Sequence, residues 1–374
     1  MWLKPSDVQL EDLLTVLKQQ TDPADYPYAE RIEQQVPLYD AVRIRREDPR
    51  AVQAEFVRAF ADGPGIVVLK GAFGNEVVDA ATAEFNRLIA RQHEAGTAAG
   101  DHFAKPGAND RVWNALEKLA IAAPDVFAAY YANDLLALVA SAWLGPAYQV
   151  TSQVNVVNPG GEGQTVHRDY HLGFQSDEVA AQYPAHVHRL SPALTLQGAV
   201  AHCDMPVESG PTLYLPHSQK YELGYLAYRQ PSFASYFVEN HVQLPLEKGD
   251  AVFFNPALFH AAGSNHSADI KRMANLLQVS SAFGRAMESI DRAGMIDAVY
   301  PTLLRLTDPV AVENVIAATA EGYAFPTNLD RDQPINGLAP LSQAGLLRQA
   351  VAESWTADRL TGALADHSTR RETH

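Results

Sequence analysis

Apolar residues in the first 146 positions recur mainly at helical spacing. The segment 5–22, PSDVQLEDLLTVLKQQTD, carries leucines and valines at near-helical intervals, with Ser6 as the expected N-cap. Residues 65–71, GIVVLKG, form an unbroken apolar run that predicts a short buried strand. Two alanine-rich stretches, 76–95 and 123–145, each predict a long helix. The pattern therefore predicts a mainly helical N-terminal part, residues 1–146.

From about Tyr148 the pattern changes to short β-branched or apolar runs separated by Gly, Pro and Asn. These runs lie within residues 148–160, 193–205, 213–216, 241–265 and 272–284. Many short strands with such turns predict a double-sheet jelly roll, that is, a double-stranded β-helix. After Arg285 the pattern returns to helix and loop. We therefore expect one domain over residues 1–374, with a mainly β core at 147–285, helices flanking it on both sides, and a helical and loop extension at 286–374.

Composition narrows the function classes. The 374 residues are 47% hydrophobic, enough for a sizeable core, and carry a net charge of −15, which argues against nucleic acid as a main partner. Arg43, Arg45 and Arg46 form one short basic run that we interpret as a solvated face rather than a phosphate site. No apolar run has the length of a membrane helix, and the N-terminus does not resemble a secretion signal, so we expect no membrane partner and a cytoplasmic location. A single cysteine, Cys203, rules out an internal disulfide and a cysteine-based zinc site.

The stretch 163–174, GQTVHRDYHLGF, holds the first candidate chemistry. Alternate side chains of a strand share a face, so His167 and Asp169 would point to one place and Arg168 would point the other way. An imidazole and a carboxylate need one more histidine to make the three-ligand set typical of non-haem Fe(II) enzymes, which leaves positions open for a chelating cosubstrate and O₂. His171 could share a face with His167 only if the segment were helical.

The third ligand is expected on another strand, and His260 is the best candidate. It follows the turn and apolar strand of GDAVFFNPALFH, at the strand's open end. Arg272 comes twelve residues later (272 − 260) at the start of the next strand, and its guanidinium could bind a carboxylate through two hydrogen bonds. The competing histidines have weaker contexts. His266 lies in a polar loop, and His202 has no arginine at a comparable offset.

These motifs resemble the phytanoyl-CoA dioxygenase family of Fe(II)- and 2-oxoglutarate-dependent oxygenases. The stretches that carry the resemblance, in chain order, are NPGGEGQTVHRD, VESGPTLYLPHS, KGDAVFFNPALFHAAGSNHS and KRMANLLQVS. They span about residues 153–283, which is nearly all of the expected β core. GQTVHRD and the spacing from histidine to arginine look most like the family members that oxidise natural products.

The resemblance implies an enzyme, a 2-oxoglutarate-dependent dioxygenase in which His167, Asp169 and His260 hold Fe(II). It also implies that Arg272 pairs with the far carboxylate of 2-oxoglutarate. Gln164 and Thr212 would contact the same cosubstrate, and O₂ would be the oxidant. The expected reaction is hydroxylation, or another oxidation, of an unactivated C–H bond of a small organic molecule, with release of succinate and CO₂. Related halogenases replace the carboxylate ligand by a small residue, so the presence of Asp169 favours hydroxylation.

The sequence departs from the family where Pro-Gly-Ser-His is common, because His217 replaces the glycine in PHSQ. Either the loop conformation differs or His217 reaches toward the substrate. Tyr170, His171 and Phe174 directly follow the expected ligands and are further candidates for the substrate pocket.

The stretch 101–114, DHFAKPGANDRVWN, could be a lid that offers Lys105, Arg111 and Trp113, although an ordinary surface loop is the commoner interpretation. The net charge favours a neutral or cationic substrate over an acyl-CoA, and the substrate itself stays open. The C-terminal extension could cover the site or support a homodimer.

Two other functions stay open. One is a metal enzyme of the cupin kind that uses no keto acid, and Arg272 argues against it because cupins do not need this arginine. The other is a non-catalytic binding protein that keeps the fold, which a missing ligand would indicate. None of the three expected ligands is missing.

Overall fold

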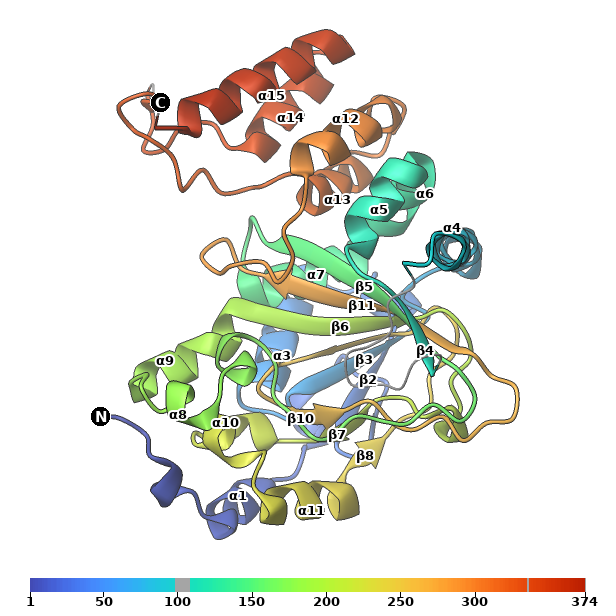
Figure 1. Cartoon of the computed structure of the whole chain (residues 1–374), viewed down its shortest axis with the longest axis vertical. Helices are drawn as coiled ribbons and strands as arrows, with labels where there is room; N and C mark the ends of the chain where they lie inside the picture. The colour runs from blue at the N-terminus through green and yellow to red at the C-terminus, as the bar shows by residue number, and fades with distance from the viewer. Residues whose placement is uncertain (98–107, 335, 374) are drawn as a thin grey trace.

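The computed structural model describes residues 1–97, 108–334 and 336–373 (Figure 1). Its centre is an eight-stranded sheet in the order β1-β2-β3-β9-β6-β11-β5-β4, antiparallel except where β2 pairs with β3. The strands are β1 (Arg31–Glu33), β2 (Val36–Asp40), β3 (Ile66–Lys70), β4 (Asn109–Val112), β5 (Gln149–Val157), β6 (Thr195–Ala201), β9 (Ala251–Phe254) and β11 (Arg272–Ser280).

A second sheet of three strands faces the large one. Its order is β10-β7-β8, and its strands are β7 (Leu213–Leu215), β8 (Val242–Gln243) and β10 (Phe259–Ala261). The two sheets share an apolar cluster in which the ring of Tyr214 on β7 meets the ring of Phe254 on β9, with centroids 5.2 Å apart. Two sheets packed face to face confirm the predicted jelly roll.

Helices cover the other face of the large sheet (Figure 1). The helices that pack on this face are α2 (Ala41–Ile44), α3 (Pro49–Ala61), α4 (Asn75–Glu94), α5 (Ala115–Ala122), α6 (Pro124–Tyr131), α7 (Asp134–Leu144), α12 (Arg292–Leu303), α13 (Pro309–Thr319), α14 (Gln343–Ala352) and α15 (Ala357–Arg371). The other helices pack in a separate apolar cluster with β7 and β10 of the small sheet, and they are α1 (Leu10–Leu17), α8 (Asp177–Ala180), α9 (Ala185–Leu190), α10 (Gly224–Ala227) and α11 (Pro231–Asn240).

Strand β3 shows why its sequence is apolar throughout. Val67 and Leu69 pack into the cluster beneath the helices, whereas Ile66 and Val68 pack into the cluster between the sheets. A strand buried on both faces has no polar side, so it appears in the sequence as a continuous apolar run. The helices α12–α15 stack beyond α5 and α6, on the side of the large sheet away from the small one (Figure 1).

The N-terminal part differs from the prediction in three ways. Residues 1–146 contain the expected strand at 65–71, which is β3, and also three strands that were not expected, β1, β2 and β4. The first helix begins at Leu10 with Gln9 as its N-cap, whereas Ser6 lies in a separate 3₁₀ turn, so the predicted cap is wrong.

The single helix predicted at 123–145 is two helices, α6 and α7, bent by 61°. Asn133 breaks it by accepting hydrogen bonds from the N–H groups of Leu135 and Leu136. Within the described residues, no helix alone is long and apolar enough to cross a membrane, and only the bent α6–α7 pair meets that test together.

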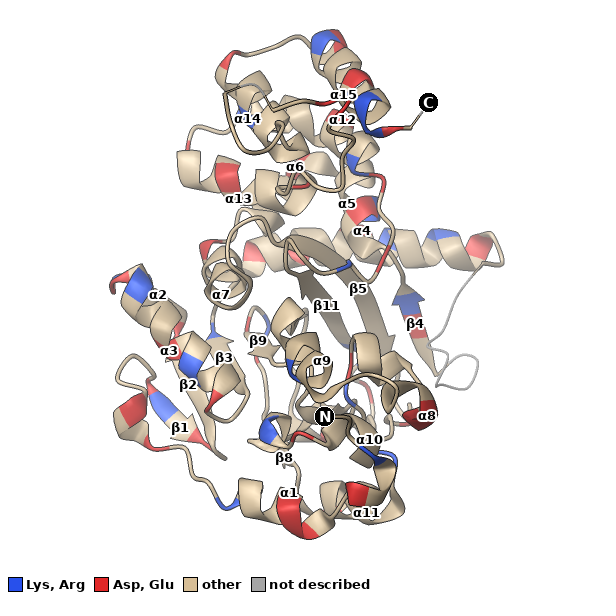
Figure 2. Cartoon of the chain, turned by 90° about the vertical axis from the view of Figure 1, so that its left-hand side faces the viewer, with Lys and Arg blue, Asp and Glu red and all other residues tan. Residues whose placement is uncertain are grey.

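Two arginines of the basic run, Arg43 and Arg45, form ion pairs or hydrogen bonds with other residues of the chain. Arg45 forms an ion pair with Asp134 at 2.9 Å, and Arg43 donates to the carbonyl oxygens of Pro27 and Ala29. Figure 2 shows acidic and basic residues spread over the outer helices and strand ends. These contacts agree with a solvated structural face.

Candidate active site

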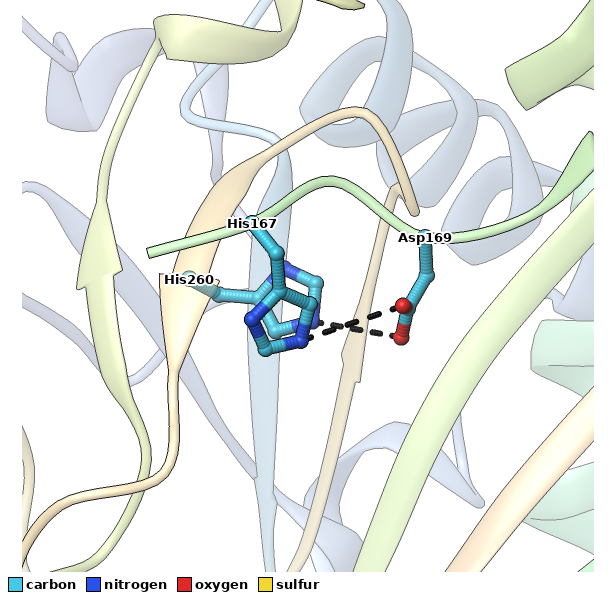
Figure 3. Close-up of side chains that lie close together, drawn as sticks. All are labelled: His167, Asp169 and His260. Atoms are coloured by element: carbon cyan, nitrogen blue, oxygen red, sulfur yellow. Dashed lines mark ion pairs between the residues drawn. The ribbon is translucent and has the colours of Figure 1, made fainter. Parts of the chain in front are cut away.

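Two separate chain segments bring the candidate ligands together. The segment around His167 pairs with β10 through an antiparallel bridge to His260, in which each residue donates its N–H to the carbonyl of the other at 2.9 and 3.2 Å. Directly bridged residues place their side chains on one face, so the two imidazoles lie side by side with ring centroids 4.4 Å apart (Figure 3). Asp169 follows two residues after His167 and points back toward both rings (Figure 3).

The three side chains offer their ligand atoms to a common point. One ligand atom from each residue lies within 4.8 Å of the other two. The Nε2 of His167 is 3.8 Å from Oδ1 of Asp169, and the Nε2 of His260 is 3.5 Å from its Oδ2 (Figure 3). Two imidazoles and one carboxylate at these separations are the donor set that suits Fe(II).

Backbone carbonyl groups fix the tautomer of each histidine. The Nδ1 of His167 lies 2.8 Å from the carbonyl oxygen of Thr165, and the Nδ1 of His260 lies 2.8 Å from that of Leu258. A carbonyl oxygen only accepts, so Nδ1 carries the proton in both rings. The lone pair on each Nε2 is therefore directed toward Asp169, and the ligand atoms are ready for a metal.

Asp169 is held as a carboxylate. Burial opposes its ionisation, but His167 and His260 in their protonated forms and the amide of Gln197 favour it, and the pKa of this carboxyl lies well below its usual range. The Nε2 of Gln197, on β6, donates to Oδ2 of Asp169, and the Asp169 N–H donates to the carbonyl oxygen of Pro256 at 3.0 Å. These contacts fix both the charge and the orientation of the side chain.

The candidate ligands open onto a cavity of about 570 Å³ between the two sheets. Gln164, Thr212 and Arg272, the residues predicted to contact 2-oxoglutarate, all line it. Gln164 lies next to β10, where its N–H donates to the carbonyl oxygen of Ala262 at 2.8 Å. Arg272 is the first residue of β11. The structure therefore brings the predicted ligands and the predicted cosubstrate residues around one space.

Arg272 is buried, and one side of its guanidinium is already used. Its Nη1 donates to the carbonyl oxygens of Ser209 and Gly263 at 3.3 and 3.0 Å. Burial lowers the pKa of Arg272 to about 10, so the group stays cationic at neutral pH. No acidic side chain of the described residues forms an ion pair with it. The cavity therefore holds a fixed positive charge whose Nε and Nη2 edge makes no hydrogen bond within the described chain.

The predicted substrate residues divide. Phe174 lines the cavity, whereas Tyr170, His171 and His217 are not among its lining residues. Tyr170 is buried and donates to the side chain of Gln278, which does line the cavity. The Nδ1 of His171 lies 3.2 Å from the hydroxyl of Ser191.

His217 has a backbone conformation that favours glycine. Its φ is +73°, in the left-handed region that favours glycine, and its N–H donates to the carbonyl oxygen of Pro64. Its ring is buried against Thr21 and Lys220, and burial followed by the Lys220 charge lowers its pKa to about 4. The loop at His217 therefore has a conformation suited to glycine, and the His217 side chain does not line the cavity.

The other candidate histidines lie elsewhere. The ring of His202 is buried between Thr82 and Tyr130, with contacts of 2.8 and 3.0 Å to their hydroxyl groups. His266 is exposed in a loop where its N–H donates to Glu208. Among the described residues, the only cluster with the geometry of a metal site is the one formed by His167, Asp169 and His260.

Sequence reasoning missed several polar residues that line the cavity from the large sheet. Gln197 and Gln278 are direct cross-strand partners on β6 and β11, and Asn155 pairs with Arg111 across β5 and β4. Gln153 precedes Asn155 by two residues on the same face. This spacing of two buried amides in QVTSQVNVV was the available signal. Arg111 and Trp113 line the cavity, whereas Lys105 lies outside the described residues.

A jelly roll with two histidines, one carboxylate and a buried arginine at its mouth is the arrangement of the iron- and 2-oxoglutarate-dependent oxygenases. The chain belongs to the phytanoyl-CoA dioxygenase family, whose sequence profile matches residues 61–273, more than half of its length. It is therefore a 2-oxoglutarate-dependent dioxygenase that uses iron, as its motifs predicted.

Several solved structures resemble the chain at low identity. The epimerase SnoN, in complex with Fe³⁺, alpha ketoglutarate and nogalamycin RO, is 22% identical over 63% of this chain and 85% of its own, with a TM-score of 0.44. The carbocyclase SnoK from nogalamycin biosynthesis is 20% identical over 70% and 93%, with a TM-score of 0.48. AviO1 from Streptomyces viridochromogenes Tue57 is 19% identical over 64% and 98%, with a TM-score of 0.45. No match was found among curated proteins.

Proposed function

We propose that this enzyme hydroxylates, or otherwise oxidises, an unactivated C–H bond of a small organic molecule, with Fe(II) held by His167, Asp169 and His260. The observation that carries the proposal is the meeting of these three side chains at one wall of a cavity that also contains Arg272. Their fit to the metal rests on the directed Nε2 lone pairs and the ionised carboxylate. When bound, iron with 2-oxoglutarate and O₂ supplies the oxidising power for C–H cleavage, and the keto acid becomes succinate and CO₂.

Arg272, Gln164 and Thr212 are the proposed cosubstrate residues. The Nε and Nη2 edge of Arg272 matches a carboxylate, which can accept two parallel hydrogen bonds from such a fork. Its positive charge offsets the far carboxylate of 2-oxoglutarate inside a buried space. Gln164 and Thr212 line the same cavity and add polar contacts that orient the keto acid.

The substrate side of the cavity extends from the metal toward β4. Gln197 contacts Asp169 from β6, and Arg111 lies on β4, three strand spacings of about 4.8 Å away, or roughly 14 Å. Gln278, directly opposite Gln197, lines the part near the metal site, and Arg111 stacks on Trp113 at 4.4 Å in the part next to β4. We infer a substrate with a polar end near β4, which a small oxygenated molecule satisfies.

The alternative is a cupin-like metal enzyme that uses no keto acid. The buried charge of Arg272, uncompensated by any ion pair within the described residues, argues against it. A non-catalytic binding protein is disfavoured because the complete donor set is retained.

The ligand assignment is tested by succinate release. Asp169→Ala and His260→Ala should each abolish iron-dependent formation of succinate from 2-oxoglutarate. His266→Ala is the matched control, because His266 follows His260 by six residues (266 − 260) but is exposed and outside the cluster. Full turnover in either ligand variant, or loss of turnover in His266→Ala alone, would show that the ligands are wrongly assigned.

A further inference from the structure

Arg168 lies between two of the proposed metal ligands and points away from them. Its side chain is 2% exposed, and its Nη2 donates to the carbonyl oxygens of Ser218 and Tyr221 at 2.6 and 3.0 Å. No acidic side chain of the described chain forms an ion pair with it. An arginine guanidinium is cationic at neutral pH. A buried cation without a carboxylate is costly, so its presence calls for a physical reason.

The guanidinium of Arg168 is enclosed by two aromatic rings and by the backbone at Gly224. Its Cζ lies 5.1 Å from the ring centre of Tyr225 and 5.0 Å from that of Phe259, so two aromatic faces hold it. A Cβ atom at Gly224 would fall 1.9 Å from the same Cζ, so only glycine leaves room for the group. The backbone approaches Arg168 from one side and the rings enclose it from others.

The segment 218–225, which receives Arg168, contacts every strand that carries a proposed ligand. The hydroxyl of Ser218 accepts the N–H of Phe259 at 2.8 Å, directly before His260. The hydroxyl of Tyr225 donates to the carbonyl oxygen of Asp169 at 3.4 Å. Arg168 itself belongs to the strand that carries His167 and Asp169.

We propose that Arg168 is a positioning residue that sets the metal-binding geometry by locking the His167–Asp169 strand and β10 to the segment 218–225. This role rests on the ligand assignment made above, and it adds a residue that touches neither metal nor cosubstrate. The extended segment that holds two ligands meets β10 at one isolated bridge, and beside it the Asp169 N–H donates to the carbonyl oxygen of Pro256 at 3.0 Å. On the other face of this segment, Arg168 adds two hydrogen bonds and two aromatic contacts.

The test measures metal binding by the metal-free full-length protein, without substrate. Co(II) is titrated by calorimetry, and the visible absorption of bound Co(II) reports the coordination geometry. Arg168→Met keeps the side-chain length but removes the donors, and it should weaken Co(II) binding at least about 10-fold and alter the spectrum, as is usual when support for a ligand is lost. Gly224→Ala should act in the same direction, because it displaces the guanidinium without removing it.

Arg292→Met is the matched control. Arg292 is a partly buried arginine that also donates to backbone carbonyls, those of Ala318 and Thr319 at 3.5 and 3.2 Å, but it does not line the cavity. This variant should bind Co(II) with wild-type affinity and spectrum. An equal loss in Arg292→Met would reduce the effect to general packing and overturn the proposal.

The outcomes distinguish a failure of the proposed metal site from a failure of the positioning role of Arg168. If the wild-type protein binds no Co(II) that Fe(II) displaces, the proposed metal site itself fails. If it binds Co(II) and a folded Arg168→Met binds it equally well with an unchanged spectrum, only the positioning role fails. If Arg168→Met does not fold, Gly224→Ala and the milder Arg168→Lys, which keeps the charge but not the fork, decide the question in the same assay.

Discussion

Replacing Arg272 by methionine removes the proposed anchor for the far carboxylate of 2-oxoglutarate. Nη1 is occupied by the carbonyls of Ser209 and Gly263, so the Nε and Nη2 edge can give two charge-assisted hydrogen bonds. Each such bond contributes about 1.5–3 kcal/mol. At the low end the two bonds together contribute about 3 kcal/mol, so their loss should raise the Kd for 2-oxoglutarate by roughly 100-fold. The KM for 2-oxoglutarate should rise by a similar factor.

The assay combines two measurements on Arg272→Met. Anaerobic titration of the Fe(II) enzyme with 2-oxoglutarate, followed by absorption spectroscopy, gives the Kd, and succinate release gives the KM. Arg272→Lys should fall between methionine and wild type, because an ammonium group is a point donor without the planar fork.

Stability provides an independent check on Arg272. In the absence of 2-oxoglutarate, Arg272→Met should unfold at the same denaturant concentration as wild type or higher, because an unpaired buried charge is gone. Added 2-oxoglutarate should stabilise the wild type more than the variant. A folded Arg272→Met with wild-type Kd and KM would refute the reasoning.

Two further predictions concern residues that support the site and the core. Gln197→Leu removes the amide that donates to Asp169 and should weaken Fe(II) or Co(II) binding by about 10- to 100-fold. Calorimetry measures this affinity, and an unchanged value would contradict a supporting role for Gln197. Burial lowers the pKa of His202 to about 3, below its value in the unfolded chain. The folded state therefore holds this histidine neutral, and the stability present above about pH 6.5 is lost as the pH falls toward 3, because only the unfolded chain gains the proton. Urea unfolding should show a loss of about 2 kcal/mol from this residue between pH 7 and pH 5, and His202→Gln should lack that component. An identical pH dependence in the two proteins would exclude His202 as the cause.

The fold class was predictable because its signals are local. Strand β3 is a nearly continuous apolar run, whereas β5 and β11 mix apolar or β-branched residues with polar ones, and each of the three was expected from its own residues. The strands β1, β2 and β4 were not expected, because they are short and β2 contains Pro37. Their existence depends on partners far along the chain, such as the pairing of Leu38 with Val68, which no local pattern contains.

The candidate site was predictable to the extent that it follows strand alternation. His167 and Asp169 are two apart on an extended segment, and the structure does point them to one place. Gln197 could not be predicted in the same way. A glutamine within a strand is unremarkable until its neighbour Asp169 is known, and that neighbour comes from a different segment.

The position of β3 in the large sheet has a consequence for how the protein is made. β3 pairs with β9, joining Ile66 to Phe254 across 188 residues (254 − 66). At about 5–20 residues per second, roughly 10–40 s of synthesis separate the two strands. Throughout that interval an apolar strand has no partner on one edge, and such an edge can pair with another chain. Neighbouring strands of the sheet are therefore made far apart in time. The exposed edge of β3 has to be kept from pairing with other chains until residue 254 has emerged.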